Sequence, residues 1–154
     1  VLRNSKGQYT LTLDGLKAGS LERKTPALEI QGDLTLVLKK GTESELLSAD
    51  AALKKGAGTL TIRGEGSLRL QGETALEGEW KEETLNQDEP SALRIEGGKL
   101  VFTGEETALY EDTVELAGGE IQIQCLNGKG TGIRAHTLDD RHFSGSLEME
   151  ESEE

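Results

Sequence analysis

Apolar residues along this chain recur at every second position in short runs, and glycine-containing breaks separate the runs. An alternating run with two or three apolar positions occurs five times, at Leu11/Leu13, Leu34/Leu36/Leu38, Leu60/Ile62, Leu93/Ile95 and Val114/Leu116. The breaks GEG, EGG and AGG follow the last three, and each leads into a second run, at Leu68/Leu70, Leu100/Phe102 and Ile121/Ile123. Alternation with a period of two predicts β-strands with one buried face. The glycines predict corners, where the backbone bends.

A second phrase, a small residue followed by a branched apolar one, returns after each set of strands. It reads Ala27-Leu28, Ala52-Leu53, Ala75-Leu76, Ala108-Leu109 and Gly132-Ile133. The branched residues lie 25, 23, 33 and 24 positions apart, and the long interval contains the polar stretch 77–91. We interpret that stretch as a loop inserted into one repeat. A regular period of this length, built from short strands and glycine turns, is typical of a stacked solenoid.

The predicted fold is therefore all-β, a single-stranded, right-handed parallel β-helix of about five to six coils. One domain is expected to span residues 1–154, with coils at 9–28, 33–53, 59–76, 92–109 and 113–133 and a C-terminal cap at about 134–150. Equivalent strands would stack their inward residues in columns, one of them predicted to be Leu13, Leu36, Ile62, Ile95 and Leu116. The alternative is a β-sandwich of antiparallel hairpins, which fits the strand lengths but leaves the constant phase unexplained.

Composition and charge narrow the classes of partner. The formal net charge is −12, which argues against nucleic acid and against anionic membrane surfaces. No apolar run reaches the length of a membrane span, so membrane insertion is not expected. Cys125 is the only cysteine, which excludes an internal disulfide and leaves a structural role for the thiol. A monomer is the default, with end-to-end stacking as the alternative because the end coils would be uncovered.

Four longer strings carry a family resemblance: LTLDGLKAGS, TPALEIQGDLTLVLKKGTESELLSAD, AALKKGAGTLTIRGEGSLRLQGE and LRIEGGKLVFTG. They resemble the right-handed parallel β-helix domains of exported proteins of clostridia and gut bacteria, some of which are described as carbohydrate-binding. The resemblance covers about residues 9–104 well. It implies a secreted or bacterial cell-surface domain that binds carbohydrate, with acidic polysaccharide as the ligand class and calcium as the one cofactor to consider. Glu43 and Glu45 stand where such relatives often carry asparagine, so no asparagine ladder is expected at that corner. No aspartate-rich calcium string matches residue by residue, so no metal site is carried over.

Two aromatic residues are candidate sugar-stacking rings. Trp80, the only tryptophan, lies in the polar insertion among several carboxylates, and Tyr110 follows the string GEETAL. Aromatic rings can stack on sugars, and carboxylates can bind hydroxyls or a cation. The structural alternative is that Trp80 folds back as a lid over one face of the solenoid.

Three arginines are candidate binding residues for the carboxylates of an acidic glycan. Arg63 and Arg69 lie on adjacent strands of one coil at outward phase, and Arg94 is placed at the phase of Arg63 one coil further on. Arg63 and Arg94 would then form a basic strip able to bind carboxylates. The structural alternative is that these charges pair with neighbouring glutamates.

Other chemistry has less support in the sequence. His136 and His142 flank Asp139, Asp140 and Arg141, but their spacing matches no established zinc pattern. Carboxylates are abundant but spread over predicted corners, whereas glycoside hydrolysis needs two at a fixed separation. We therefore expect a non-catalytic domain that binds carbohydrate. A structural spacer or adhesin segment without a small ligand is the alternative, and a polysaccharide lyase or hydrolase comes third.

Overall fold

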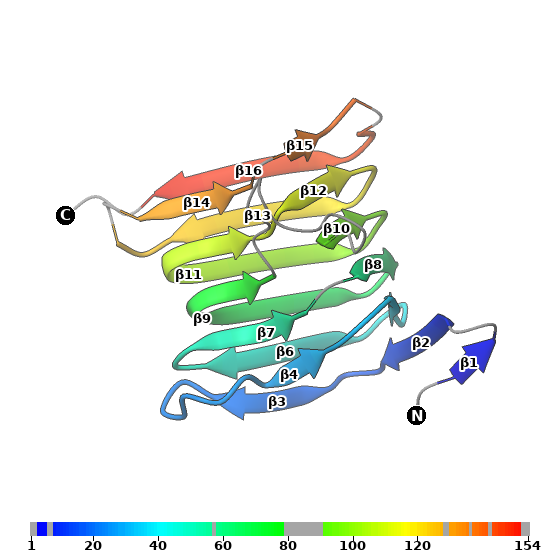
Figure 1. Ribbon diagram of the computed structural model, residues 1–154, viewed down its shortest axis with the longest axis horizontal. Helices are drawn as coiled ribbons and strands as arrows, with labels where there is room; N and C mark the ends of the chain where they lie inside the picture. The colour runs from blue at the N-terminus through cyan, green and yellow to red at the C-terminus, as the bar shows by residue number, and fades with distance from the viewer. Residues whose placement is uncertain are drawn as a thin grey trace, which may run out of the picture.

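The chain forms a parallel β-solenoid of about five turns, as a computed structural model shows (Figure 1). The structure describes residues 3–5, 8–56, 58–78, 91–127, 130–135, 137–141 and 143–151. Within these ranges every regular element is a β-strand, and every strand pairing except β1 with β2 is parallel. The predicted all-β solenoid is thereby confirmed, and the alternative sandwich of antiparallel hairpins is wrong.

Each coil contributes strands to the faces of the solenoid in a repeating order. The first three coils contain β2 (Gln8–Leu13), β3 (Lys17–Ser20) and β4 (Leu28–Ile30); β5 (Leu34–Leu38), β6 (Glu43–Ser48) and β7 (Ala51–Lys55); and β8 (Gly58–Gly64) and β9 (Ser67–Glu77). The next two contain β10 (Ser91–Ile95) and β11 (Lys99–Tyr110), then β12 (Thr113–Leu116), β13 (Glu120–Cys125) and β14 (Thr131–Arg134). β15 (Thr137–Asp139) and β16 (Ser146–Glu151) begin another turn, and β1 (Arg3–Ser5) pairs with β2.

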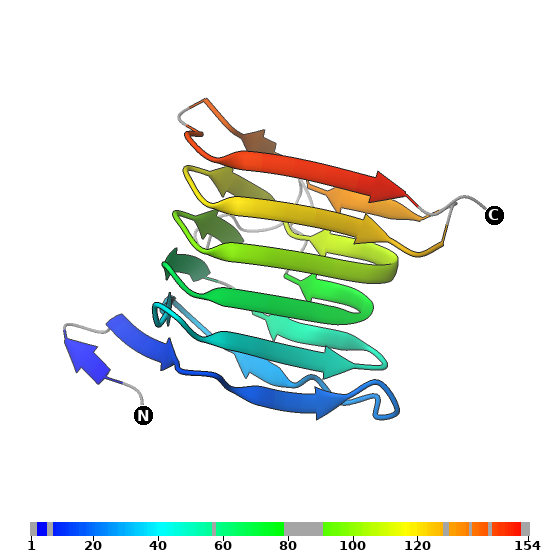
Figure 2. The same cartoon turned by 180° about the vertical axis from the view of Figure 1, so that it is seen from behind.

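The strands assemble into three faces. Face 1 is the seven-stranded sheet, in the order β1-β2-β5-β8-β10-β12-β15. Face 2, seen in front in Figure 2, contains β3, β6, the first halves of β9 and β11, β13 and β16. Face 3 contains β4, β7, the second halves of β9 and β11, and β14. β9 and β11 pass around a corner without a break, so faces 2 and 3 form one continuous nine-stranded sheet.

The inward side chains stack in columns, because equivalent strands lie in register. The repeated small-plus-branched phrase forms the column of face 3: Leu28, Leu53, Leu76, Leu109 and Ile133 are paired in succession. On face 1 the predicted column is right from Leu36 onwards, but its first member is Leu11. Leu13 pairs with Leu38 instead. The prediction was wrong there by two residues, a shift that leaves both leucines pointing inward.

The GEG string forms a corner between faces 1 and 2, as the glycines predicted. Gly64 ends β8 with φ +114°, a conformation that L side chains rarely adopt. A Cβ built on Gly64 would collide with the backbone carbonyl oxygen of Leu38 in the coil below. The amides of Glu65 and Gly66 both donate to that oxygen, at 3.2 and 3.1 Å. Glycine is therefore required at Gly64 by both conformation and close stacking.

The polar insertion lies between face 3 of the third coil and face 1 of the fourth. β9 ends at Glu77, and β10 begins at Ser91 in parallel register with β8. Residues 79–90, including Trp80, lie outside the described residues. The segment expected to contain the C-terminal cap supplies β15 and β16, which add one strand each to faces 1 and 2. No helix in the described ranges is long and apolar enough to cross a membrane.

Candidate functional sites

Arg94 of face 1 is held by two carboxylates. Its Nε lies 2.6 Å from Glu96 Oε2, and its Nη1 lies 2.5 Å from Glu115 Oε1. The hydrogen bonds to Glu115 and then to Glu96 raise the pKa of the guanidinium further above its usual high value. Arg94 therefore keeps its charge, and neighbouring glutamates already pair with its Nε and Nη1.

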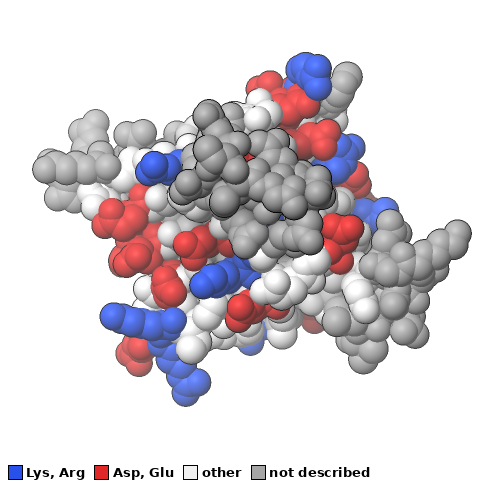
Figure 3. All heavy atoms as spheres, in the orientation of Figure 1, with Lys and Arg blue, Asp and Glu red and all other residues white. Residues whose placement is uncertain are grey.

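The predicted basic strip does not form in the way the sequence indicated. Arg94 is in register with Thr61, whereas Arg63 is in register with Val37. The two arginines are thus offset along the strand direction by two residues, and the assumed equivalence of their phases was wrong. Arg63 is exposed near the corner of face 1. Acidic and basic side chains are interspersed on the side of the molecule seen in Figure 3.

Arg69 lies on face 2, around the corner from Arg63. Its Nη2 donates to Gln71 Oε1 at 3.1 Å, and its Nη1 lies 4.0 Å from Glu45 Oε2. Slightly more than half of the Arg69 side chain is exposed, at 53%. Such a surface ion pair contributes little to stability, so Arg69 remains able to bind a ligand.

Tyr110 occupies an outward column of face 3. The column runs Glu29, Lys54, Glu77, Tyr110 and Arg134 through successive coils. The Arg134 guanidinium lies 5.9 Å from the centre of the Tyr110 ring, within the range of a cation–π interaction. One side of the candidate sugar-stacking ring is therefore in contact with protein.

The histidines and the cysteine singled out in the sequence are not part of any site that the structure describes. His136 and His142 lie outside the described residues, and within those residues no group of three or more His, Cys, Asp and Glu side chains could hold a metal ion. Cys125 is buried at the end of β13, with Sγ 3.2 Å from the carbonyl oxygen of Asn127. Burial against backbone carbonyls agrees with the structural role expected for this thiol.

A shallow groove of about 330 Å³ lies on the outer side of face 2. The strands that form it are β11, β13 and β16, which stand next to one another in Figure 2. Val101 and Gln122, both half-buried, lie in its middle, and the exposed side chains lining it are Lys99, Glu120, Ser146 and Glu148. The groove thus offers a small apolar surface bordered by an amide, a hydroxyl and charges of both signs.

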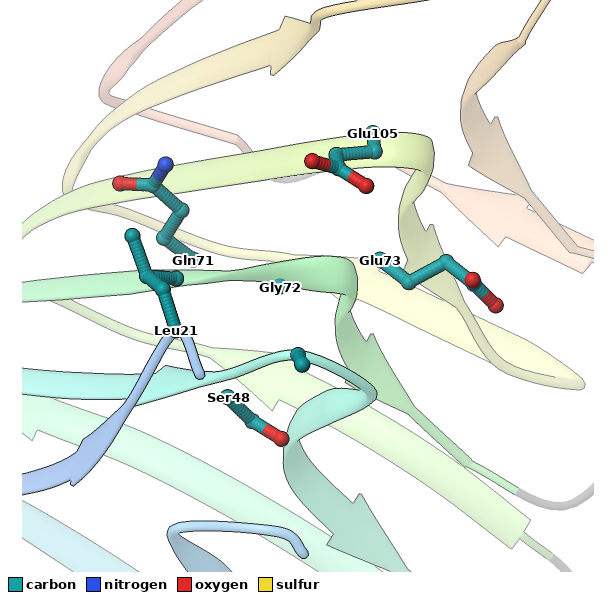
Figure 4. Close-up of a pocket in the computed structure, with 7 residues that line it drawn as sticks. Leu21, Ser48, Gln71, Gly72, Glu73 and Glu105 are labelled. Atoms are coloured by element: carbon teal, nitrogen blue, oxygen red, sulfur yellow. The ribbon is translucent and has the colours of Figure 1, made fainter. Parts of the chain in front are cut away.

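A smaller hollow of about 120 Å³ lies at the corner between faces 2 and 3 (Figure 4). Leu21 lies at one side, and Ser48, Gly72, Glu73 and Glu105 come from three consecutive coils. Figure 4 shows the Glu73 carboxylate directed away from Leu21, well separated from that of Glu105. The two carboxylates do not converge, so the hollow provides no obvious cation site.

The most unusual group of side chains is one that the sequence did not indicate. Lys55 and Glu111 form an ion pair with 2.9 Å between Nζ and Oε2, and neither side chain has any exposed surface. Ser91, also buried, donates to Glu111 Oε1 at 2.7 Å and accepts from Lys55 Nζ at 2.9 Å. A signal was present in the sequence, since Lys55 falls two positions after the inward Leu53. A lysine in an inward column was not expected, because buried charges are rare.

Comparisons with family models, with curated proteins and with solved structures found no significant match to this chain. The class of protein that the fold defines is a parallel β-solenoid, a repeat architecture in which each coil buries its apolar side chains against the next.

Proposed function

We propose that this chain is a non-catalytic β-solenoid domain that binds carbohydrate through the outer side of face 2. The observation that carries the proposal is the groove over β11, β13 and β16. Its amide, hydroxyl and carboxylate groups match the hydrogen-bonding needs of sugar hydroxyls, and Val101 provides an apolar surface for the carbon–hydrogen face of a ring.

The periodicity of the face suits an extended polymer. Equivalent positions on successive coils are about 4.8 Å apart, the ordinary spacing between paired strands. Arg69, Val101, Gln122 and Glu148 form one outward column through four coils. A polysaccharide lying along that column would meet a new set of polar groups at each coil, so weak contacts could add up.

The charges in the groove favour neutral sugars over strongly acidic ones. Lys99 stands 4.0 Å from Glu120, and Glu148 lies on the next strand. Acidic polysaccharide would have to depend on Arg69 and on Arg63, since two carboxylates already pair with Arg94. A secreted or bacterial cell-surface location accompanies the proposal and is supported by the family resemblance of the strand and corner strings.

A glycan-array screen of the folded protein, with and without Ca²⁺, tests the proposal. We expect binding that is lost in the variant Gln122→Ala/Ser146→Ala and kept in the matched variant Arg63→Ala/Arg94→Ala on face 1. Loss only in the arginine variant would move the site to face 1 and contradict the groove. An array on which the folded protein binds nothing would refute carbohydrate binding.

The second candidate is a rigid structural spacer or adhesin segment without a small ligand. Its support is the pair of parallel ladders that join each coil to the next, one from β2 to β15 and one from β3 to β16. A silent array, combined with cooperative unfolding of the whole stack, would favour this function.

A further inference from the structure

Lys55, Gly78 and Glu111 occupy the same corner in three successive coils. Lys54 pairs with Glu77, and Glu77 with Tyr110, so the residues that follow these three stack in the same order. Gly78 has no side chain, and a Cβ built on it would collide with the Glu111 carboxylate. Lys55 and Glu111 can therefore meet across the third coil, beside Gly78, the last described residue before the polar insertion.

The two oxygens of Glu111 have different surroundings. Oε1 accepts hydrogen bonds from Ser91 Oγ at 2.7 Å and from the Asp112 amide at 2.8 Å. Oε2 lies 2.9 Å from Lys55 Nζ but receives no hydrogen bond with acceptable angles. Nζ instead directs its hydrogens to Ser91 Oγ and the carbonyl oxygen of Gly56, each at 2.9 Å. The donors on Oε1 polarise the carboxyl group, and the amine nitrogen stands beside the other oxygen.

The surroundings also favour a neutral product over a pair of ions. Both side chains are fully buried, and removing charges from water is costly even when they are paired. Holding an amine against a carboxyl group in one fixed geometry corresponds to effective concentrations of about 10⁵–10⁸ M. No exposed surface of either side chain is available for water to reverse the reaction.

We propose that Lys55 and Glu111 condense after folding to form an intramolecular amide cross-link. One proton first passes from Lys55 Nζ to Glu111 Oε2, 2.9 Å away, and the resulting amine attacks Cδ of the neutral carboxyl group, so that a bond forms between nitrogen and carbon. The negative charge that develops on Oε1 is stabilised by the Ser91 hydroxyl and the Asp112 amide, in the manner of an oxyanion hole. A second proton passes directly from the nitrogen to Oε2, which already carries the first, the Cδ–Oε2 bond breaks, and one water leaves. Atoms and charges balance without an oxidant or co-reactant.

Ser91 has a catalytic role in this step, because its hydroxyl contacts both reacting groups. The Ser91→Ala variant keeps the amine and the carboxyl group but loses the donor to Oε1 and the hydroxyl that accepts a hydrogen bond from Nζ. Removing one oxyanion donor typically slows a reaction of this kind by about 10²–10³-fold. Newly refolded Ser91→Ala protein is therefore expected to acquire the cross-link much more slowly than the wild type.

The intact mass of the denatured full chain tests the proposal directly. Folded wild-type protein should be lighter than its sequence by one water, and a protease digest should contain a branched peptide joining the segments around Lys55 and Glu111. The Asp14-Gly15 pair can also lose one water by succinimide formation, so the digest must locate the change. The matched control Lys55→Met/Glu111→Leu keeps the buried volume without the reacting groups and should show the full mass.

Folded wild-type protein with the full sequence mass would overturn the proposal and leave a non-covalent ion pair. The proposal would equally be wrong if the digest placed the lost water at Asp14, or if the Lys55→Met/Glu111→Leu variant retained the loss. An ester between Ser91 and Glu111 would have the same mass, but hydroxylamine would cleave it, whereas the amide should survive.

Discussion

The column of face 3 gives a sharp stability prediction, because its members differ in burial but not in chemistry. Leu76 has no exposed surface and is stacked between Leu53 and Leu109, which are equally buried. Leu28 starts the same column and is only half-buried, and among the described strands β4 pairs with β7 on one side alone. The perturbation is Leu76→Ala, with Leu28→Ala as its matched control.

The expected loss of stability depends on the number of carbon groups removed and on the volume of the cavity left behind. Three carbon groups contribute about 2.4 kcal/mol at about 0.8 kcal/mol each. At Leu76 the hydrogen bonds of the coils on both sides fix the strand spacing, so the cavity cannot close, and the total should reach about 3–5 kcal/mol. At Leu28 part of the side chain is already in contact with water, and about 1 kcal/mol is expected.

Urea unfolding followed by circular dichroism measures both variants. The midpoint should fall much further for Leu76→Ala than for Leu28→Ala, with the slope of free energy against urea unchanged. Equal losses in the two variants, within about 0.5 kcal/mol, would refute the reasoning. That result would mean either that further packing covers the first coil or that the column is not continuous.

Three further predictions use the same unfolding assay. Gly64→Ala should lower the free energy of unfolding by more than about 2 kcal/mol, because alanine would have a positive φ there and its Cβ would collide with backbone. Gly41→Ala, at φ +82° with open space around it, should lower it by about 1 kcal/mol. Similar losses in the two variants would contradict the close stacking at Gly64. Arg94→Ala should lower the free energy of unfolding by only about 0.2–1 kcal/mol, and by less in high salt, because exposed ion pairs contribute little and are screened. A larger loss that does not depend on salt would contradict a surface role for Arg94. Lys55→Met should be about 3–5 kcal/mol less stable than Lys55→Met/Glu111→Leu, because it buries a lone carboxylate; equal stabilities would show that water reaches the pair.

The solenoid could be predicted from the sequence because every coil places apolar side chains at the same positions facing the core. Leu53, Leu76 and Leu109 all follow a small residue, 23 positions apart and then 33 across the polar insertion, and the structure pairs them in order. The period-two pattern does not fix register, however, since a shift of two residues keeps the same side chains inward. That ambiguity explains both the misplaced Leu13 and the incorrect alignment of Arg63 with Arg94.

The buried cluster of Lys55, Ser91 and Glu111 could not be predicted from the hydrophobic pattern, for a different reason. Lys54 and Lys55 are identical neighbours, and only the backbone at the end of β7 determines which one points inward. Alternation from Leu53 places Lys55 inward, but it is broken just before that point, where Ala51, Ala52 and Leu53 are all buried, so the pattern was a weak guide. Glu111 is 56 positions along the chain from Lys55, so the pairing depends on coil stacking, which requires the three-dimensional register. The groove on face 2 likewise depends on which outward side chains become neighbours.

The position of the Lys55–Glu111 contact has a mechanical consequence. β2 and β16 belong to opposite ends of the stack (Figure 1), so a pull between them peels coils away from the ends instead of shearing all ladders at once. Peeling can proceed through the outer strands until it reaches the second or the fourth coil, which Lys55 and Glu111 join across the third. Through the proposed amide cross-link the tension then passes between the two side chains and bypasses the coil between them. The centre of the solenoid should therefore resist extension as one unit, while its ends give way strand by strand.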